Sequence, residues 1–119
     1  GRMFQLLDNL VSNALKFTPS GGRVEISVAQ NGRAVLEVRD TGVGFTRDEA
    51  SRVFDRFFRT EDAVTWQVPG TGLGLFIAHA ITAAHGGTIS AAPRVGGGAA
   101  FKVELPSATG HDSVGWQTA

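Results

Sequence analysis

DTGVGF at residues 40–45 and GTGLGL at residues 70–75 are the two glycine-rich segments around which this sequence of 119 residues is organised. Glycine inside a regular element costs roughly 0.5–1 kcal/mol relative to alanine, so such clusters indicate tight turns or a ligand close to the main chain. The second segment runs into an alanine-rich apolar stretch that predicts a helix. Because free amides at a helix N-terminus attract anions, we expect a phosphate chain there.

Neither segment has the pattern of the two common phosphate-binding loops. A P-loop needs a lysine directly after its last glycine, and the only lysines are Lys16 and Lys102. A dinucleotide loop reads G-x-G-x-x-G within a βαβ unit, whereas residues 70–75 read G-x-G-x-G. Neither of these two loops is therefore present, although glycine-exposed amides at a helix start still suit a phosphate.

The flanking pattern predicts an α+β domain over residues 1–106, with about three helices on one face of a mixed or antiparallel sheet. Apolar spacing predicts a helix over residues 3–17, and alternation predicts strands at 23–30 and 33–40 joined by an Asn-Gly turn. A Thr46–Glu49 capping box predicts the start of a second helix, and residues 73–85 are expected to form a third. Residues 88–90 and 98–106 are expected to form a last pair of strands. We expect the apolar arc of the first helix to contain Met3, Phe4, Leu7, Leu10, Val11 and Ala14, and the second helix to carry Val53, Phe54, Phe57 and Phe58, with Phe54 and Phe57 mainly in the core.

Composition limits the classes of partner. Eleven basic and eleven acidic residues cancel, which argues against nucleic-acid binding and against direct membrane contact. The absence of cysteine excludes disulfides and thiolate metal sites. Residues 59–69 lack periodicity and are expected to form a mobile loop, and residues 107–119 a flexible polar tail.

The first helix and the first glycine segment supply the polar groups of a nucleotide site. Asn9, Asn13 and Lys16 follow at i, i+4 and i+7 on one helical face, where carboxamide oxygens suit Mg²⁺ and the ammonium suits phosphate. Asp40, at a strand end, can accept the amino group of adenine, and Gly42 and Gly44 let the backbone approach the base. The alternatives are solvated asparagines and an Asx turn at Asp40.

Four motifs in order resemble the N box, first glycine box, F box and second glycine box of sensor histidine kinases, within the GHKL (Bergerat-fold) superfamily. They are NLVSNALKFTP (9–19), DTGVGF (40–45), FDRFFR (54–59) and GTGLGL (70–75). The resemblance implies an α/β sandwich that holds ATP and Mg²⁺, with Asn13 as magnesium ligand assisted by Asn9, and with Lys16 on phosphate. It further implies that Phe17 packs near the adenine, that Asp40 reads the adenine amine, and that phosphate contacts come from Arg59, Gly70, Thr71, Gly72, Leu73 and Gly74.

The resemblance also implies what the chain does. Such a domain donates the γ-phosphoryl group of ATP to a histidine on a dimerisation and phosphoacceptor domain of the same parent, with a response regulator downstream. It acts in the cytoplasm, whether or not the parent is membrane-anchored, and the family's first strand is expected to be missing here. Superfamily ATPases carry a Glu where this chain has Asn9. A carboxamide cannot deprotonate water, so we expect ATP binding without efficient hydrolysis.

Other functions compete with this interpretation. DTG is also the triplet of aspartic proteases, but that fold is almost entirely β and three helices are predicted here. A non-catalytic nucleotide-binding module would have the same pocket and stays open. His79, His85 and His111 lie outside any phosphoacceptor motif, so structural roles are expected for them, and the role of Trp66 stays open.

Overall fold

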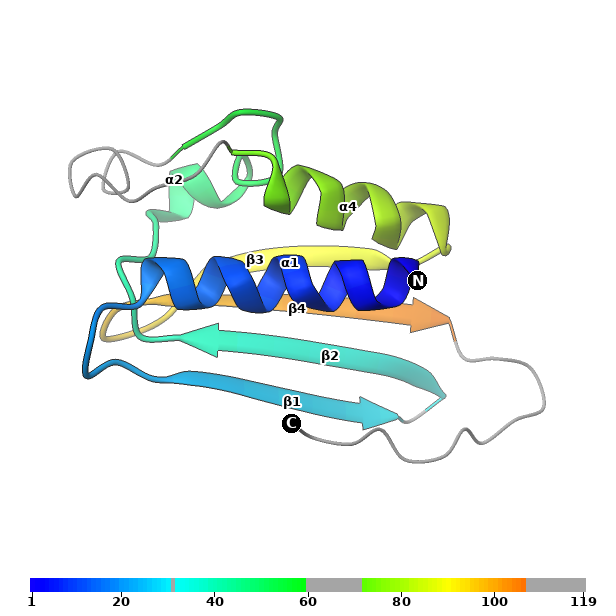
Figure 1. Ribbon diagram of the computed structural model, residues 1–119, viewed down its shortest axis with the longest axis horizontal. Helices are drawn as coiled ribbons and strands as arrows, with labels where there is room; N and C mark the ends of the chain where they lie inside the picture. Colours follow the sequence, from blue (N-terminus) through cyan, green and yellow to red (C-terminus); the bar gives the residue numbers. More distant parts are fainter. Residues whose placement is uncertain (31, 60–71, 107–119) are drawn as a thin grey trace.

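A four-stranded antiparallel sheet, covered on one face by helices, forms the part of the chain that the computed structural model describes, residues 1–30, 32–59 and 72–106 (Figure 1). The strands lie in the order β1-β2-β4-β3. Their bounds are Val24–Gln30 for β1, Arg33–Asp40 for β2, Thr88–Pro93 for β3 and Ala99–Pro106 for β4, with helices α1 (Arg2–Phe17), α2 (Arg47–Ala50) and α4 (Gly74–Ala84). The expected α+β fold is confirmed. The sequence left a mixed or an antiparallel sheet open, and all pairs of described strands are antiparallel.

The strand register separates an apolar face from a polar one. Val38 lies between Ile26 of β1 and Phe101 of β4, and all three belong to the core or pack against it. One residue along, Glu37 lies between Ser27 and Lys102 on the other face. Because side chains alternate along a strand, this register directs one face of the sheet toward the helices.

Helix α1 packs on the core through a different stripe from the one expected. Leu6, Leu10 and Ala14, four residues apart, are buried, whereas Phe4 is 71% exposed and Leu7 37% exposed. The expected arc is therefore wrong at Phe4 and Leu7 and omitted Leu6. The helix has apolar residues on two sides, and packing against both α4 and β2 selects the stripe that is buried.

The second helix is shorter than expected. The Thr46–Glu49 capping box is confirmed, but α2 ends at Ala50. Successive turns follow, closed by hydrogen bonds to the third preceding residue, as from Asp55 to Arg52 (3.0 Å). Val53 is buried and Phe54 packs on the core, but Phe57 is 61% exposed at φ 66°, so its expected core position is wrong.

Helix α4 ends as the sequence predicts. The amide of Gly87 donates to Thr82 (3.0 Å) and that of Gly86 to Ala83 (3.0 Å), which is the hydrogen-bond pattern of a Schellman motif. Gly86 adopts φ 75°, a conformation that favours glycine. This tight ending turns the chain directly into β3.

Candidate functional site

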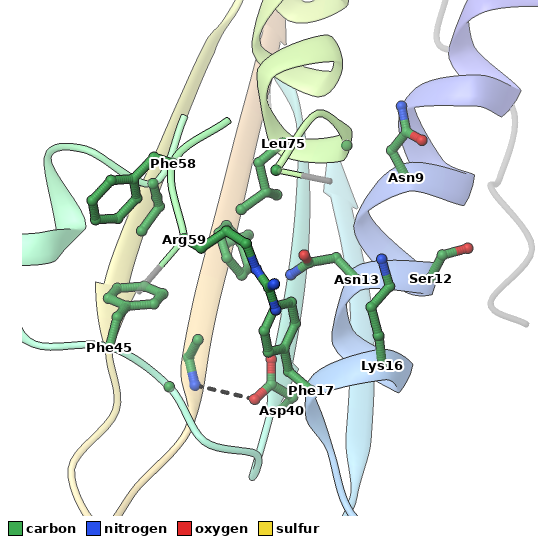
Figure 2. Close-up of a pocket in the computed structure, with 16 residues that line it drawn as sticks. Asn9, Ser12, Asn13, Lys16, Phe17, Asp40, Phe45, Phe58, Arg59 and Leu75 are labelled. Atoms are coloured by element: carbon green, nitrogen blue, oxygen red, sulfur yellow. Dashed lines mark hydrogen bonds between the residues drawn. The ribbon is translucent and has the colours of Figure 1, made fainter. Parts of the chain in front are cut away.

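The polar face of α1 forms one wall of a cavity of about 140 Å³ (Figure 2). Asn9, Asn13 and Lys16 all line it, together with Phe17 at the end of the helix. Residues spaced by one helical turn share a face, which explains why the three polar side chains meet the same cavity. Asn9 and Asn13 are only half-exposed, so neither is a fully solvated helix position.

Asp40 lies at the end of β2 and lines the same cavity, although it is only 1% exposed. Its Oδ1 accepts hydrogen bonds from the amides of Gly42 (2.9 Å) and Ala99 (3.3 Å; dashed in Figure 2). The bond from Gly42 is that of an Asx turn, so this alternative is correct as far as Oδ1 is concerned. Within the described residues, no group donates a hydrogen bond to Oδ2.

The charge state of Asp40 depends on opposed effects. Burial raises the pKa of the Asp40 carboxyl above its ordinary value of 3.8, because desolvation disfavours the ionised form. The amides of Gly42 and Ala99 and the positive charge of Arg94 lower the pKa. The fold thus supplies several groups that favour a buried carboxylate.

Gly42 and Gly44 allow close approaches between backbones. A side chain at Gly42 would clash with the carbonyl of Phe17, and one at Gly44 would lie 2.6 Å from the carbonyl oxygen of Gly98. The amide of Val43 donates to the Phe17 carbonyl (3.1 Å) and joins this loop to the end of α1. Gly44 lines the cavity and Gly42 does not. Their approach to a base stays a prediction.

The segments before and after residues 60–71 form the other wall. Arg59, Gly72, Gly74 and Leu75 line it, and the Arg59 side chain extends across the cavity toward α1 (Figure 2). The amide of Phe57 donates to the carbonyl of Gly72 (2.9 Å), which joins the two segments. Leu73 is not among the lining residues. Gly70, Thr71, Trp66, most of the expected mobile loop and the tail at 107–119 lie outside the described residues.

Several lining residues were missed by the sequence interpretation, and most of them are apolar. They are Ser12, Phe45, Val53, Phe58, Leu75, Ala99 and Phe101. Phe45 closes the DTGVGF segment, and that position was a usable signal. Ala99 and Phe101 are brought to the cavity only by the pairing of β4 with β2, 59 residues after Asp40 in the case of Ala99.

The polar atoms suit a ligand that brings its own oxygens. Asn9 Nδ2 is the one buried side-chain atom without a hydrogen-bond partner among the described residues. Leaving a buried donor unpaired costs free energy, so this amide favours a ligand that supplies an acceptor, such as a phosphate oxygen. The described residues contain no cluster of three His, Cys, Asp or Glu side chains. The carboxamide oxygens of Asn9 and Asn13 therefore fit a Mg²⁺ ion that arrives with phosphates and water.

A comparison with known families assigns the chain. The family described as histidine kinase-, DNA gyrase B-, and HSP90-like ATPase matches residues 1–109. The chain belongs to this ATPase family.

Sensor histidine kinases are its relatives within this ATPase family. The chain is 43% identical over 108 residues to the sensor histidine kinase WalK of Bacillus subtilis, a match that covers 88% of this chain and 18% of WalK. It is 37% identical over 106 residues to the sensor histidine kinase RppB of Synechocystis, covering 88% of this chain and 23% of RppB. The chain thus spans about a fifth of the length of these relatives.

Solved structures of this ATPase family share the fold. The mycobacterial sensor histidine kinase MprB is similar with a TM-score of 0.77 and 33% identity, over 88% of this chain and 72% of that one. Full-length ShkA in complex with AMPPNP is similar with a TM-score of 0.73 and 36% identity, over 88% of this chain and 21% of that one. Within the described residues, no helix has the length and hydrophobicity to cross a membrane.

Proposed function

We propose that this chain is the ATP-binding part of a sensor histidine kinase. It binds ATP with Mg²⁺ and donates the γ-phosphoryl group to a histidine on a separate dimerisation and phosphoacceptor domain of its parent. The observation that supports this most is the buried Asp40 in the same cavity as Asn9, Asn13 and Lys16. The AMPPNP complex of ShkA supports a nucleotide as the ligand.

Asp40 and the apolar lining are suited to a purine base. Phe17, Phe45 and Phe101 line the cavity and offer ring surfaces to a flat base, while Oδ2 of Asp40 accepts the adenine amino group. A hydrogen bond to an ionised acceptor contributes about 1.5–3 kcal/mol. A base with a carbonyl in place of this amino group, as in GTP, would place two acceptors against each other and bind more weakly.

Asn9, Asn13, Lys16 and Arg59 are suited to the phosphates. When bound, Mg²⁺ would supply positive charge that offsets the negative charge of the phosphates during transfer. Asn13 would hold it with help from Asn9, and the Lys16 ammonium and the Arg59 guanidinium would bind phosphate oxygens. In the transfer, the bond from the γ-phosphorus to its bridging oxygen breaks, a bond to the imidazole nitrogen forms, and ADP leaves with the electron pair.

Among the described residues that line the cavity, no side chain is free to act as a base for water. Asp40 is the one carboxylate among the described residues that line the cavity, and two amides already hold its Oδ1. Asn9 stands where superfamily ATPases carry a Glu. Because water attack needs a positioned proton acceptor, we expect slow hydrolysis of ATP and transfer to an imidazole nucleophile instead.

The nucleophile comes from outside the described residues of this chain. His79 packs against Phe54 with tilted rings whose centroids are 5.7 Å apart, and His85 Nδ1 lies 2.9 Å from the Ile81 carbonyl oxygen. Neither residue lines the cavity. The parent's phosphoacceptor domain therefore supplies the histidine, in the cytoplasm, and a response regulator receives the phosphoryl group next.

Phosphotransfer in trans tests the proposal. The chain is mixed with radiolabelled ATP, Mg²⁺ and a separately purified phosphoacceptor fragment of the parent, and acid-labile phosphate on the fragment is measured. We expect labelling only when both proteins are present, and none with Asn13→Asp or Lys16→Ala. Lys102→Ala is the matched control, because Lys102 is exposed and lies away from the cavity.

Three outcomes would contradict the proposal in different ways. Failure of the folded chain to bind any adenine nucleotide would remove the nucleotide site itself. ATP binding without transfer to the fragment would favour a non-catalytic regulatory module. Rapid hydrolysis by the chain alone would place it with the ATPases of the superfamily.

A further inference from the structure

Arg94 connects the turn between β3 and β4 to the strand end that carries Asp40. Its Nη1 donates a hydrogen bond to the main-chain carbonyl oxygen of Asp40 (3.1 Å), across 54 residues of sequence. Its Nη2 lies 3.9 Å from Oε1 of Glu25 on β1. The Arg94 side chain is 27% exposed, so most of it lies against the protein. One guanidinium thus reaches both β1 and the end of β2.

The turn that carries Arg94 is held firmly and lies directly against Asp40. The Arg94 amide donates to the carbonyl of Gly98 (3.0 Å), and the Gly97 amide donates to that of Arg94 (3.1 Å). Gly98 adopts φ 97°, and a side chain there would clash with the Asp40 carbonyl. Hydrogen bonds therefore hold both the main chain of Arg94 and its guanidinium group.

We propose that Arg94 is a positioning residue for nucleotide recognition, which holds the end of β2 so that Asp40 presents Oδ2 to the adenine amino group. This inference rests on the proposed function, because it assigns a role within the same site. Arg94 does not line the cavity and acts only through Asp40.

The contacts of Asp40 explain why one more hydrogen bond matters. Gly42 and Ala99 fix Oδ1, and Arg94 fixes the main-chain carbonyl of the same residue. With the carbonyl held, rotation of the strand end cannot carry the side chain away from the base. A recognition group displaced by even a fraction of an ångström loses hydrogen-bond energy, so the support of a binding residue affects affinity.

The charge of Arg94, like its hydrogen bond, favours an Asp40 that can bind the adenine amino group. It lowers the pKa of the Asp40 carboxyl, against the effect of burial. Two other cationic side chains, Lys16 of α1 and Arg59, line the cavity with Asp40, and Glu25 partly neutralises Arg94 from β1. An ionised Asp40 is the stronger acceptor for an amino group.

Discrimination between ATP and inosine triphosphate (ITP) tests the role of Arg94. ITP differs from ATP at one edge of the base, where a carbonyl replaces the amino group and N1 carries a hydrogen. The ratio of the two affinities therefore reports how strongly Asp40 recognises the amino group. We expect Arg94→Ala to lower ATP affinity roughly three- to tenfold and ITP affinity far less, measured by calorimetry with Mg²⁺. Arg94→Lys should restore part of the ratio, because an ammonium can still donate one hydrogen bond.

Arg39→Ala is the matched control. Arg39 precedes Asp40 on β2, but it is exposed and pairs with Glu37 at 2.8 Å on the other face of the sheet. We expect this variant to bind both nucleotides as the wild type does. Both affinities come from one sample, so any unfolded fraction cancels in their ratio.

The possible results separate this inference from the proposed function. If the wild type does not bind ATP, the proposed function fails and the inference fails with it. If the wild type prefers ATP and Arg94→Ala keeps that preference, only the role of Arg94 is overturned. An equal loss for ATP and ITP also overturns it, since Arg94 would then only support the fold. A wild type that binds ATP and ITP equally well overturns it too, because Asp40 would then not recognise the amino group.

Discussion

Asp40 is the residue at which stability and function oppose each other. A carboxylate that is 1% exposed is costly to keep ionised, yet it is the acceptor proposed for the adenine amine. Perturbed acids of this kind concentrate at functional sites. The fold compensates in part, with two amides on Oδ1 and a guanidinium on the main-chain carbonyl.

Replacing Asp40 by asparagine should stabilise the protein at neutral pH. Burial raises the folded-state pKa of Asp40 above its ordinary value of 3.8, so the folded protein binds this proton more tightly than the unfolded chain does. Between 3.8 and the folded-state pKa, the contribution of Asp40 to the free energy of unfolding therefore falls as pH rises. Asparagine can still accept the Gly42 and Ala99 amides but carries no charge.

Urea unfolding of both proteins at neutral and at mildly acidic pH measures this difference. We expect Asp40→Asn to be the more stable protein at neutral pH, and its advantage to shrink as pH falls toward 3.8. Other carboxylates affect both proteins alike and cancel in the comparison. A less stable Asp40→Asn protein at neutral pH would mean that the contacts of the carboxylate outweigh its desolvation.

Helix α1 presents three different faces along its length. Asn9, Asn13 and Lys16 line the cavity, Leu6, Leu10 and Ala14 enter the core, and a third side exposes Phe4 and Leu15. The helix packs against α4 and β2 at once, which fixes its rotation and so aims the polar face at the cavity. Core packing by this helix is therefore also what orients the site.

Truncation of one core leucine of α1 should destabilise the domain strongly. Leu10 is fully buried, so Leu10→Ala removes buried area and leaves a cavity, at a cost of about 2–5 kcal/mol in the free energy of unfolding. Leu15→Ala is the matched control on the same helix, because Leu15 is 62% exposed, and a change within about 0.5 kcal/mol is expected. Chemical denaturation measures both, and similar losses for the two variants would contradict the packing described for α1.

At the scale of the whole molecule, the cavity is built from parts that are distant in the sequence. Its lining residues come from α1, from the end of β2, from the segment at residues 44–59, from the start of α4 and from β4. These parts meet because the chain places β4 between β2 and β3, so that the strand carrying Ala99 and Phe101 runs beside Asp40. A ligand in this cavity would contact all of them at once.

Nucleotide should therefore stabilise the whole domain against unfolding. A ligand that binds only the folded state at one hundred times its Kd adds about 2.7 kcal/mol. For a domain of this size, that raises Tm by roughly 10 °C. Thermal unfolding with and without ADP and Mg²⁺ measures the shift. Asp40→Ala should show much less of it, and an unchanged wild-type Tm at saturating nucleotide would contradict the site.

Much of the fold could be predicted from local signals. Apolar spacing located α1, alternation located β1 and β2, and the paired glycines after residue 85 marked the end of α4. Nine of the residues assigned to the nucleotide site from the sequence also line the cavity, which are Asn9, Asn13, Lys16, Phe17, Asp40, Gly44, Arg59, Gly72 and Gly74. These signals depend on neighbours within one or two turns of chain, so they can be read directly from the sequence.

Other features depend on contacts between distant residues and became visible only in three dimensions. The buried stripe of α1 was misplaced because α4 and β2, rather than the helix itself, determine which apolar side is covered. The helix after Thr46 does not continue past Ala50: the amides of Arg52, Asp55 and Phe58 bond three residues back, and the amide of Phe57 bonds to the distant Gly72. The β2–β4 register brings Ala99 to Asp40 and Phe101 to the cavity, and the β3–β4 turn brings Arg94 to Asp40. The free energy of such contacts comes from pairs that are far apart in the chain, and no local pattern records which distant segment will pair with which.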